Sequence, residues 1–460
     1  MRNIRRMQRR RFSRPLSNCI AATCALAFAG NIQGAIDRWT GGVSVNWADL
    51  NWSGGNNPPI DFDLLEFDSA GATGTNLNNN LAPFFNVAGI TFTPFASAYT
   101  FAGNTITLAG PVVNNSLNIE TINFGLELPA AQTFTTTALG SDIILGGVIS
   151  GTGTISKLGP GTLTLANAQN SYTGETIFGG GIVNVASVSD YGVASSIGAR
   201  NTTDENNSLT GISLHFRGGT LQYTGSTPQS TNREIRMLNG VTGATIDASG
   251  SDPSATLSFT HTGANINLFD TPGTRTLTLT GSNTGKNSFS LRLTDQATNA
   301  TSLQKAGPGM WVIPNSDNTH TGETIFAGGI LNLASLSDYG VVSSIGARTL
   351  AQENTTVTGV SLHFQGGTLQ YTGTAPQSTN RNIRFLNGEG GTIDASGATP
   401  EATLSFTHTG PNINLFDTPG TRTLTLTGTN TGNNTFSILM ANQAGAATSL
   451  RKSGPGTWIL

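Results

Sequence analysis

The chain has 460 residues, of which only 11% are charged, and its 23 Lys and Arg against 26 Asp and Glu give a formal net charge of −3. A hydrophobic share of 37% excludes a disordered chain, and the excess of acids with few lysines disfavours nucleic acid or an anionic membrane as a partner. Both cysteines, Cys19 and Cys24, precede the expected mature chain, so we expect no disulfide or thiol chemistry in it.

Residues 1–29 are predicted to form a signal peptide, with residue 35 as an alternative end. Seven arginines and no acid precede or flank an apolar run from about Ile20 to Phe28, which is too short to span a bilayer. The stretch Arg9–Phe12 also loosely fits a twin-arginine signal, and both routes lead to export. Without these arginines, 16 basic residues face 26 acids, which gives a net charge of −10.

Residues 36–153 are predicted to form an N-terminal cap and the first coils of a solenoid. Trp39, Trp47 and Trp52 cluster near the start of this region. A solenoid must cover its first open coil, so we expect these tryptophans to cap the stack rather than to form a glycan platform.

The chain then repeats itself. The predicted units are residues 154–301 and 302–449, and residues 450–460 begin a third, truncated copy. Tyr172–Arg200 and His320–Arg348 are identical at 23 of 29 positions. No Pro-, Ser- or charge-rich linker separates the copies, which favours continuous stacking over the alternative of two separate sandwich domains.

Substitutions between the copies have the period of a strand. Val183 and Val185 become leucine in the second copy, whereas the Asn184 between them is unchanged. An apolar residue at every second position predicts strands with one buried face, and Gly-Pro-Gly and Gly-Gly turns separate them. The sequence therefore predicts an all-β fold with roughly 20–25 residues per three-strand coil. Leu163, Trp311 and Trp458 occupy equivalent strand positions, where packing is expected rather than sugar stacking.

The segment that begins each unit resembles a known family. The pattern Lys-x-Gly-x-Gly, then Tyr/His-Thr-Gly-x-Thr, then Gly-Gly-x-Leu/Val-x-Leu/Val covers Lys157–Val185 and Lys305–Leu333, and it starts again at Lys452. It is similar to the autotransporter-associated β-strand repeat, also called the passenger-associated transport repeat. Trp39–Gly153 resembles the leader of such proteins. The resemblance implies a right-handed parallel β-helix (β-solenoid) passenger, secreted or displayed on the surface of a Gram-negative-type cell.

The same resemblance implies a function and partners. It implies a non-enzymatic stalk with an adhesion role, whose repeats assist vectorial folding during export. Glycans, host surfaces or neighbouring cell surfaces are the implied ligands. An outer-membrane translocator is also expected as a partner; since the 460 residues do not include it, we expect the sequence to be a fragment or a truncated product.

Four acids per unit are candidates for catalytic residues, because parallel β-helices include polysaccharide lyases and hydrolases. Each is duplicated and lies close to a glycine or proline, so we expect structural turn residues rather than an active site, which would gain nothing from an identical second copy. The pairs are Glu175/Glu323, Asp190/Asp338, Asp247/Asp394 and Asp270/Asp417.

The histidines give no metal site by spacing. His215/His363 and His261/His408 are copies of each other, His320 replaces Tyr172, and no two lie at metal-ligand spacing. A satisfied strand histidine is the expected role of His215. We therefore expect no catalytic residue, no cofactor and no metal.

Two other functions remain open from the residues. A carbohydrate-active β-helix enzyme would need unique acids outside the repeat. A cell-envelope structural protein would differ from the favoured interpretation, a secreted or surface-displayed passenger, only in its anchor. The acids that qualify alternate with apolar residues, so we expect them on a solvated edge face; they are Asp61, Asp63, Glu66 and Asp68.

Overall fold

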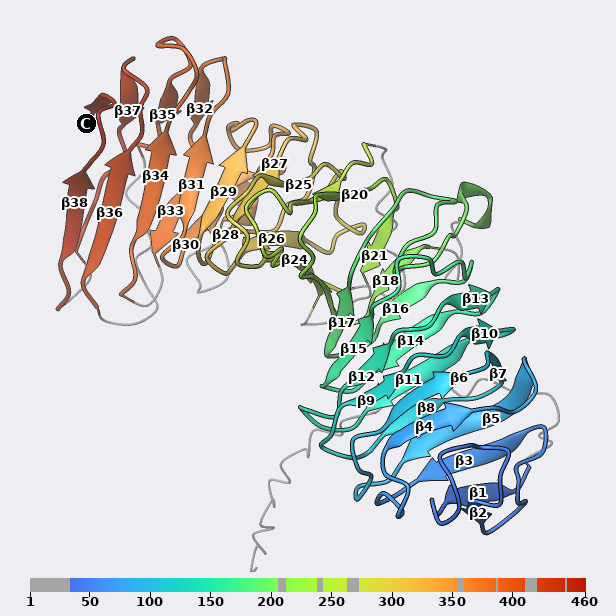
Figure 1. The fold of residues 1–460 in the computed structure, drawn as a ribbon. Helices are drawn as coiled ribbons and strands as arrows, with labels where there is room; N and C mark the ends of the chain where they lie inside the picture. The colour runs from blue at the N-terminus through green and yellow to red at the C-terminus, as the bar shows by residue number, and fades with distance from the viewer. Residues whose placement is uncertain are drawn as a thin grey trace, which may run out of the picture.

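The computed structural model is a bent rod of stacked β-coils (Figure 1). It describes residues 34–205, 212–237, 243–262, 273–353, 360–385, 388–409, 420–442 and 445–460. The predicted signal peptide, residues 1–29, lies outside the described residues. Apart from two short 3-10 helices, Thr202–Asp204 and Leu350–Gln352, the regular structure in the described ranges consists of strands. The predicted all-β parallel solenoid is confirmed.

The strands form four sheets that run along the rod. Sheet 1 contains β1 (Ile36–Trp39), β2 (Trp52–Ser53), β3 (Asp63–Phe67), β5 (Phe85–Phe92), β7 (Ile106–Leu108), β8 (Val112–Asn114), β10 (Leu126–Leu128), β11 (Gln132–Thr136), β13 (Ile149–Gly151), β14 (Ile155–Leu158), β16 (Thr176–Phe178), β18 (Leu214–Phe216) and β21 (Ile235–Met237). Sheet 2 contains β4 (Asn76–Asn79), β6 (Thr100–Gly103), β9 (Glu120–Ile122), β12 (Ile143–Leu145), β15 (Thr162–Leu165), β17 (Ile182–Val185), β19 (Thr220–Tyr223), β22 (Ala244–Ala248), β24 (Arg275–Thr280), β26 (Thr301–Lys305), β28 (Thr324–Phe326), β30 (Leu362–Phe364) and β33 (Ile383–Phe385).

The remaining two sheets belong to the C-terminal half of the rod. Sheet 3 contains β20 (Gln229–Thr231), β23 (Leu257–Phe259), β25 (Asn287–Phe289), β27 (Met310–Ile313), β29 (Ile330–Leu333), β31 (Thr368–Tyr371), β34 (Gly391–Ala395), β36 (Arg422–Thr427) and β38 (Thr448–Lys452). Sheet 4 contains β32 (Gln377–Thr379), β35 (Leu404–Phe406), β37 (Asn434–Phe436) and β39 (Trp458–Ile459).

Coil length follows the prediction in most N-terminal coils, but several coils of each unit are longer, as between Ala244 and Leu277, which lie 33 residues apart. Strands of neighbouring coils pair in parallel, and paired residues lie 20 apart at Ile143 and Leu163 and 26 apart at Arg275 and Thr301. The spacing rises to 38 between Val183 and Leu221, because a long segment leaves the coil there. The same excursion recurs in the second unit.

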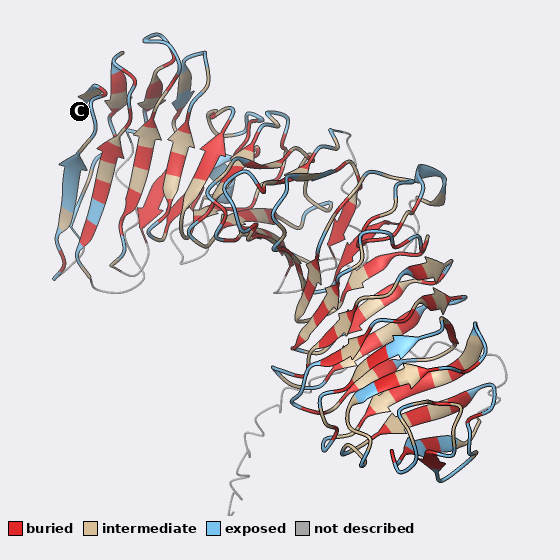
Figure 2. Ribbon diagram, in the orientation of Figure 1, coloured by how far each residue is buried: buried red, intermediate tan, exposed pale blue. Residues whose placement is uncertain are grey.

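Alternation along each strand builds the core. In β24, Arg275, Leu277 and Leu279 are buried while the threonines between them are only half-buried, and Figure 2 shows this red and tan banding along the stacked arrows. Leu163 and Trp311 are fully buried, as predicted, and Trp458 is half-buried. At the N-terminal end, Trp39, Trp47 and Trp52 are buried as well and pack edge-to-face, with Trp39 and Trp52 ring centroids 5.1 Å apart. Their burial fits a cap rather than a glycan platform.

Unit 2 continues the rod without a linker but does not repeat the sheet positions of unit 1. Strands β14, β16, β18 and β21 belong to sheet 1, whereas their sequence equivalents β26, β28, β30 and β33 belong to sheet 2. Sheet 1 ends at β21, sheet 3 begins at β20, and sheet 2 runs through both units. Each unit is thus displaced by one face around the rod, and the rod changes direction where sheet 1 gives way to sheet 3 (Figure 1).

Candidate functional site

The long segment after β17 lies beside β18 of sheet 1, and its copy after β29 lies beside β30 of sheet 2. We call these the side segments; their described residues are 186–205 with 212–213, and 334–353 with 360–361. Outward-facing positions of β18 and β30 are therefore buried, and all three residues of each strand are shielded from solvent. A polar cluster lies beneath each side segment.

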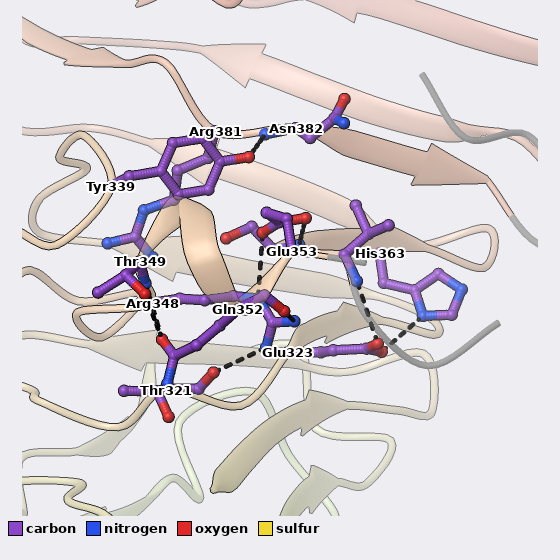
Figure 3. A network of polar contacts seen from close by, with 12 residues as sticks. Thr321, Glu323, Tyr339, Arg348, Thr349, Gln352, Glu353, His363, Arg381 and Asn382 are labelled. Carbon is purple, nitrogen blue, oxygen red and sulfur yellow. Dashed lines mark hydrogen bonds and ion pairs between the residues drawn. The ribbon is translucent and has the colours of Figure 1, made fainter. Parts of the chain in front are cut away.

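In unit 2 this cluster centres on Glu323, His363 and Arg348 (Figure 3). Glu323 Oε2 lies 3.1 Å from His363 Nδ1, and both side chains are nearly buried. The backbone N–H of Val360 donates to Glu323 Oε1 at 3.3 Å. Glu323 thus links His363 to the end of the side segment. The sequence predicted only a structural residue of the local turn, so this longer connection was not predicted.

Arg348 ties the same segment to the coil beneath it. Its Nε donates to Glu353 Oε1 at 3.0 Å, and its two terminal nitrogens donate to the carbonyls of Thr321 at 2.8 Å and Gln352 at 2.6 Å. The Ser361 N–H closes the group by donating to Glu353 Oε2 at 3.3 Å. Charge-assisted bonds of this kind are stronger than neutral ones, so the cluster fixes the side segment to the rod.

Unit 1 carries the corresponding Glu–His and Arg–Glu pairs, but Glu175 Oε1 lacks a counterpart of the bond from the Val360 N–H. His215 Nδ1 lies 3.4 Å from Glu175 Oε2, and Arg200 Nε donates to Glu205 Oε1 at 3.0 Å. Burial of Glu205 raises its pKa to about 7 despite the neighbouring Arg200. His215 was expected on an ordinary strand face; its burial and its pairing with Glu175, 40 residues earlier, could not be read from the alternation.

Arg233 and Arg381 are structural residues that the sequence analysis missed. Arg381 is buried, and its guanidinium donates to four carbonyls of side segment 2. The acceptors are Ile345 at 2.9 Å, Gly346 at 2.7 Å, Val341 at 3.1 Å and Asp338 at 3.3 Å. Desolvation lowers the pKa of Arg381 to about 10. The duplicated Ser-Thr-Asn-Arg before β21 and β33 was the available signal, an arginine that both copies keep just before a strand.

Lys157 and Lys305, the first residues of the repeated motif, are buried. Lys157 points into the core, where its Nζ donates to Thr136 Oγ1 at 2.9 Å and to the carbonyls of Leu158 at 2.9 Å and Gly159 at 2.8 Å. A longer contact of 3.4 Å reaches Gly180 O in the next coil. The ammonium group therefore joins three successive coils, and desolvation lowers its pKa to about 8.

The other duplicated acids bond neighbouring coils rather than their own turns alone. Asp190 Oδ1 accepts the N–H of Asn232 at 2.8 Å, 42 residues further along the chain. Asp247 ends a carboxamide ladder in which Asn184 donates to Gln222 and Gln222 donates to Asp247, each at 2.9 Å. The second copy repeats both arrangements with Asp338 and Asp394. Asp270 and Asp417 lie outside the described residues.

One prediction about the N-terminal acids was wrong. Asp63 was expected on a solvated edge face, but it is buried and accepts hydrogen bonds from the N–H groups of Ala35 and Ile60, both at 2.8 Å. Asp63 takes an inward strand position that is usually apolar, because backbone N–H groups of the cap need a hydrogen-bond acceptor there. It adjoins Asp37, whose pKa is raised to about 7 by burial and by Asp63. Glu66 pairs with Arg38 at 2.5 Å, Asp61 is exposed and Asp68 is half-buried.

The remaining histidines differ between the units. His261 Nε2 lies 3.3 Å from Glu234 Oε1, whereas His408 Nδ1 bonds the carbonyl of Asn380 at 2.9 Å. Across the described ranges, no three His, Cys, Asp or Glu residues are placed to hold a metal ion. In the same ranges, no helix is long and apolar enough to cross a membrane.

His320 should make unit 2 sensitive to acid. Desolvation, followed by the charge of Arg381, lowers its pKa from 6.5 to about 3. Below pH 6.5 the unfolded chain binds a proton that the folded chain does not, so stability falls as the pH falls through this range. In the unmodified chain the free energy of unfolding should fall between pH 7 and pH 5. We expect this fall to be about 2 kcal/mol smaller in His320→Tyr, which restores the residue of unit 1.

Urea unfolding of both proteins at the two pH values measures this difference. Tyr172 supports the design, since its hydroxyl lies 2.7 Å from Thr176 Oγ1 and unit 2 keeps a threonine, Thr324, at the equivalent position. An identical loss in both proteins would contradict a neutral, buried His320.

Comparison with known proteins agrees with this architecture. A family model described as passenger-associated-transport-repeat matches residues 155–185 and 303–333. The chain is 31% identical over 444 residues to the "Adhesin BmaC autotransporter" of Brucella suis biovar 1 (strain 1330). The alignment covers 95% of the chain but 12% of that adhesin, so the chain spans about an eighth of its relative's length. No solved structure matches the chain.

Proposed function

We propose that the chain, which carries two passenger-associated transport repeats, forms part of an autotransporter passenger and serves as a non-enzymatic adhesive stalk, secreted or displayed on the surface of a Gram-negative bacterium. The named adhesin relative supports the adhesive role. Glycans, host surfaces or neighbouring cell surfaces are the proposed ligands, and an outer-membrane translocator is the proposed partner during export.

One observation carries the proposal: the buried charged side chains form hydrogen bonds that hold the coils and the side segments together. Lys157 donates to Thr136 Oγ1 and Gly180 O in the neighbouring coils, Arg381 donates to carbonyls of side segment 2, and Glu323 accepts from the backbone N–H of Val360. Each such bond connects one coil to another or a side segment to the rod. Stacking of this kind lets each coil template the next, which suits folding that proceeds along the chain during export.

A carbohydrate-active enzyme is the rival function. Glycoside hydrolysis needs two carboxyl groups that reach the substrate, usually about 5–10 Å apart. The paired Asp37 and Asp63 are both buried and bond the cap backbone. A shallow hollow bordered by Ser249, Asp252 and Asn283 has one carboxylate in its lining, and that carboxylate bonds Ser254. Neither place supports the rival.

The proposal is tested by binding and by catalysis in parallel. We expect the purified, fluorescently labelled chain to bind epithelial monolayers or immobilised glycans saturably, and to release no reducing ends from a polysaccharide panel. Heat-unfolded chain at the same concentration is the control for non-specific adsorption. Reducing-end release, or binding equal to that of the unfolded chain on every surface, would contradict the proposal.

A further inference from the structure

Three successive coils of the N-terminal region expose large apolar side chains at one corner of the rod. The corner lies where the chain passes from sheet 1 to sheet 2. Phe95 and Leu139 are each 79% exposed and Leu117 is 72% exposed. Pro94 and Ile119 lie beside them and are exposed too. We call these five residues the apolar corner.

Strand register places the three principal residues one above another. Phe92 pairs with Asn114, and Asn114 pairs with Thr136. Phe95, Leu117 and Leu139 each follow these paired positions by three residues. Neighbouring strands lie about 4.8 Å apart, so the three side chains form a continuous apolar stripe across the coils.

Closing the coil does not require these turns. In the coils that follow, the same corner is made by three residues each: 159–161, 179–181 and 217–219. Gly159 has a φ of +80°, and an added Cβ would lie 1.8 Å from the carbonyl oxygen of Thr136, so only glycine fits so tight a turn. The N-terminal coils instead use residues 93–99, 115–119 and 137–142, and the extra length carries the apolar residues outward.

The three long turns are braced against one another. Asn118 Nδ2 in the second turn donates to Ala96 O in the first at 2.7 Å, and Ser141 Oγ in the third donates to Ser116 O in the second. Asn114 Nδ2 adds bonds to Asn118 O at 2.8 Å and Asp142 O at 3.0 Å. A surface held in this way is pre-organised, which reduces the entropy lost when a partner binds.

The charge near the apolar corner is mostly acidic, although the buried Lys157 lies beneath the third turn, 2.9 Å from Thr136 Oγ1. Between residues 39 and 156 the sequence holds eight Asp and Glu and no Lys or Arg. Two of these acids flank the apolar corner: Asp68 accepts Thr93 Oγ1 of the first turn at 2.8 Å, and Asp142 ends the third turn. Both are half-buried. Such a field attracts basic groups and repels a second copy of this surface or an anionic membrane.

We propose that the apolar corner is a docking surface for a protein segment that presents apolar side chains flanked by Lys or Arg. The proposal rests on the adhesive function above and names the chemistry of one partner. The apolar side chains of the partner cover Phe95, Leu117 and Leu139, and its basic groups lie near Asp68 and Asp142.

The test uses the purified chain and a variant, Phe95→Ser/Leu117→Ser/Leu139→Ser. The matched control is Val193→Ser/Val341→Ser/Val342→Ser, which removes three exposed apolar side chains from the side segments. The probes are an 18-residue peptide of alternating leucine and lysine, its leucine and glutamate counterpart, and phosphatidylcholine and phosphatidylglycerol vesicles. Circular dichroism checks that each variant stays folded.

We expect the lysine peptide to bind the unmodified chain and the control variant, and to bind the corner variant at least tenfold more weakly, with no binding of the glutamate peptide. Equal affinity of all three proteins for the lysine peptide would overturn the proposal. Stronger binding to either vesicle, or a dimer of the unmodified chain that the corner variant loses, would overturn it as well.

The same proteins on cell monolayers separate this proposal from the proposed function. Cell binding by the unmodified chain that the corner variant retains would support adhesion and overturn the role of the apolar corner. Absence of cell binding by the unmodified chain would overturn the adhesive function, while the peptide measurement would still decide the docking surface.

Discussion

Replacing Arg233 with methionine is expected to release side segment 1 from the rod. Arg233 is buried, and its guanidinium donates to Ile197 O and Gly198 O at 2.8 Å, Val193 O at 3.2 Å and Asp190 O at 3.3 Å. Methionine fills part of the space but donates nothing, so several buried carbonyls lose their partners. Each unsatisfied group costs about 1–3 kcal/mol, and we expect a loss of about 4 kcal/mol in local stability.

The position of Arg233 explains why this effect should be large. The face formed by β7, β10 and β13 continues through residues 171–173, because Ser171 N donates to Ile149 O, and reaches Ala199, whose N–H donates to Tyr172 O. The Arg233 guanidinium bonds the carbonyls of Ile197 and Gly198, which directly precede Ala199. Arg233 therefore anchors side segment 1 at the place where it stacks on the coil beneath.

Hydrogen exchange followed by mass spectrometry measures the effect directly. Peptides covering residues 186–199 should exchange at least 100-fold faster in Arg233→Met, whereas peptides from β8 to β12 should not change. Arg217→Met is the matched control, since Arg217 lies in the same unit but is exposed. Unchanged protection of residues 186–199 in Arg233→Met would show that the carbonyls find other donors.

The second large effect is expected for Lys157→Met. The ammonium of Lys157 joins Thr136, the turn at Leu158 and Gly159, and Gly180. Its loss leaves carbonyls of a tight turn without donors, so we expect the free energy of unfolding of the first unit to fall by about 3 kcal/mol. Urea denaturation followed by circular dichroism measures the change.

The chain contains its own control for this experiment. Lys452 occupies the equivalent position and bonds Ser453 O and Gly454 O, both at 2.8 Å, but it is exposed. Lys452→Met should therefore change the unfolding free energy by about 0.5 kcal/mol or less. Similar losses for both variants would mean that burial does not determine the contribution of this lysine.

Much of the fold was predictable because strand and turn signals are local. Val183, Asn184 and Val185 alternate, and their substitutions in the second copy preserve the alternation, which identified strands with one buried face. The missing linker correctly predicted continuous stacking, since β24 pairs with β26 and β25 pairs with β27 across the start of unit 2. The burial of Leu163 and Trp311 followed from the same reasoning.

The candidate sites were less predictable because they depend on distant contacts. Glu175 and His215 are 40 residues apart, and their pairing requires the side segment to leave the coil and return exactly one coil later. Asp63 looked like one acid in an alternating strand, yet the cap turns it inward to bond Ala35 and Ile60. The apolar corner likewise appears only when Phe95, Leu117 and Leu139, 22 residues apart, are brought into register.

The sequence by itself determined the β-solenoid, its strands and the repeat, because the alternation of side chains and the conformational limits of glycine and proline act within a few residues. Tertiary structure alone decided which face each strand joins. Units 1 and 2 have nearly the same sequence, yet β14 lies in sheet 1 and β26 in sheet 2. A strand pairs with the free edge of the strand in the preceding coil. The sheet that it joins is therefore determined by the coils before it and not by its own residues.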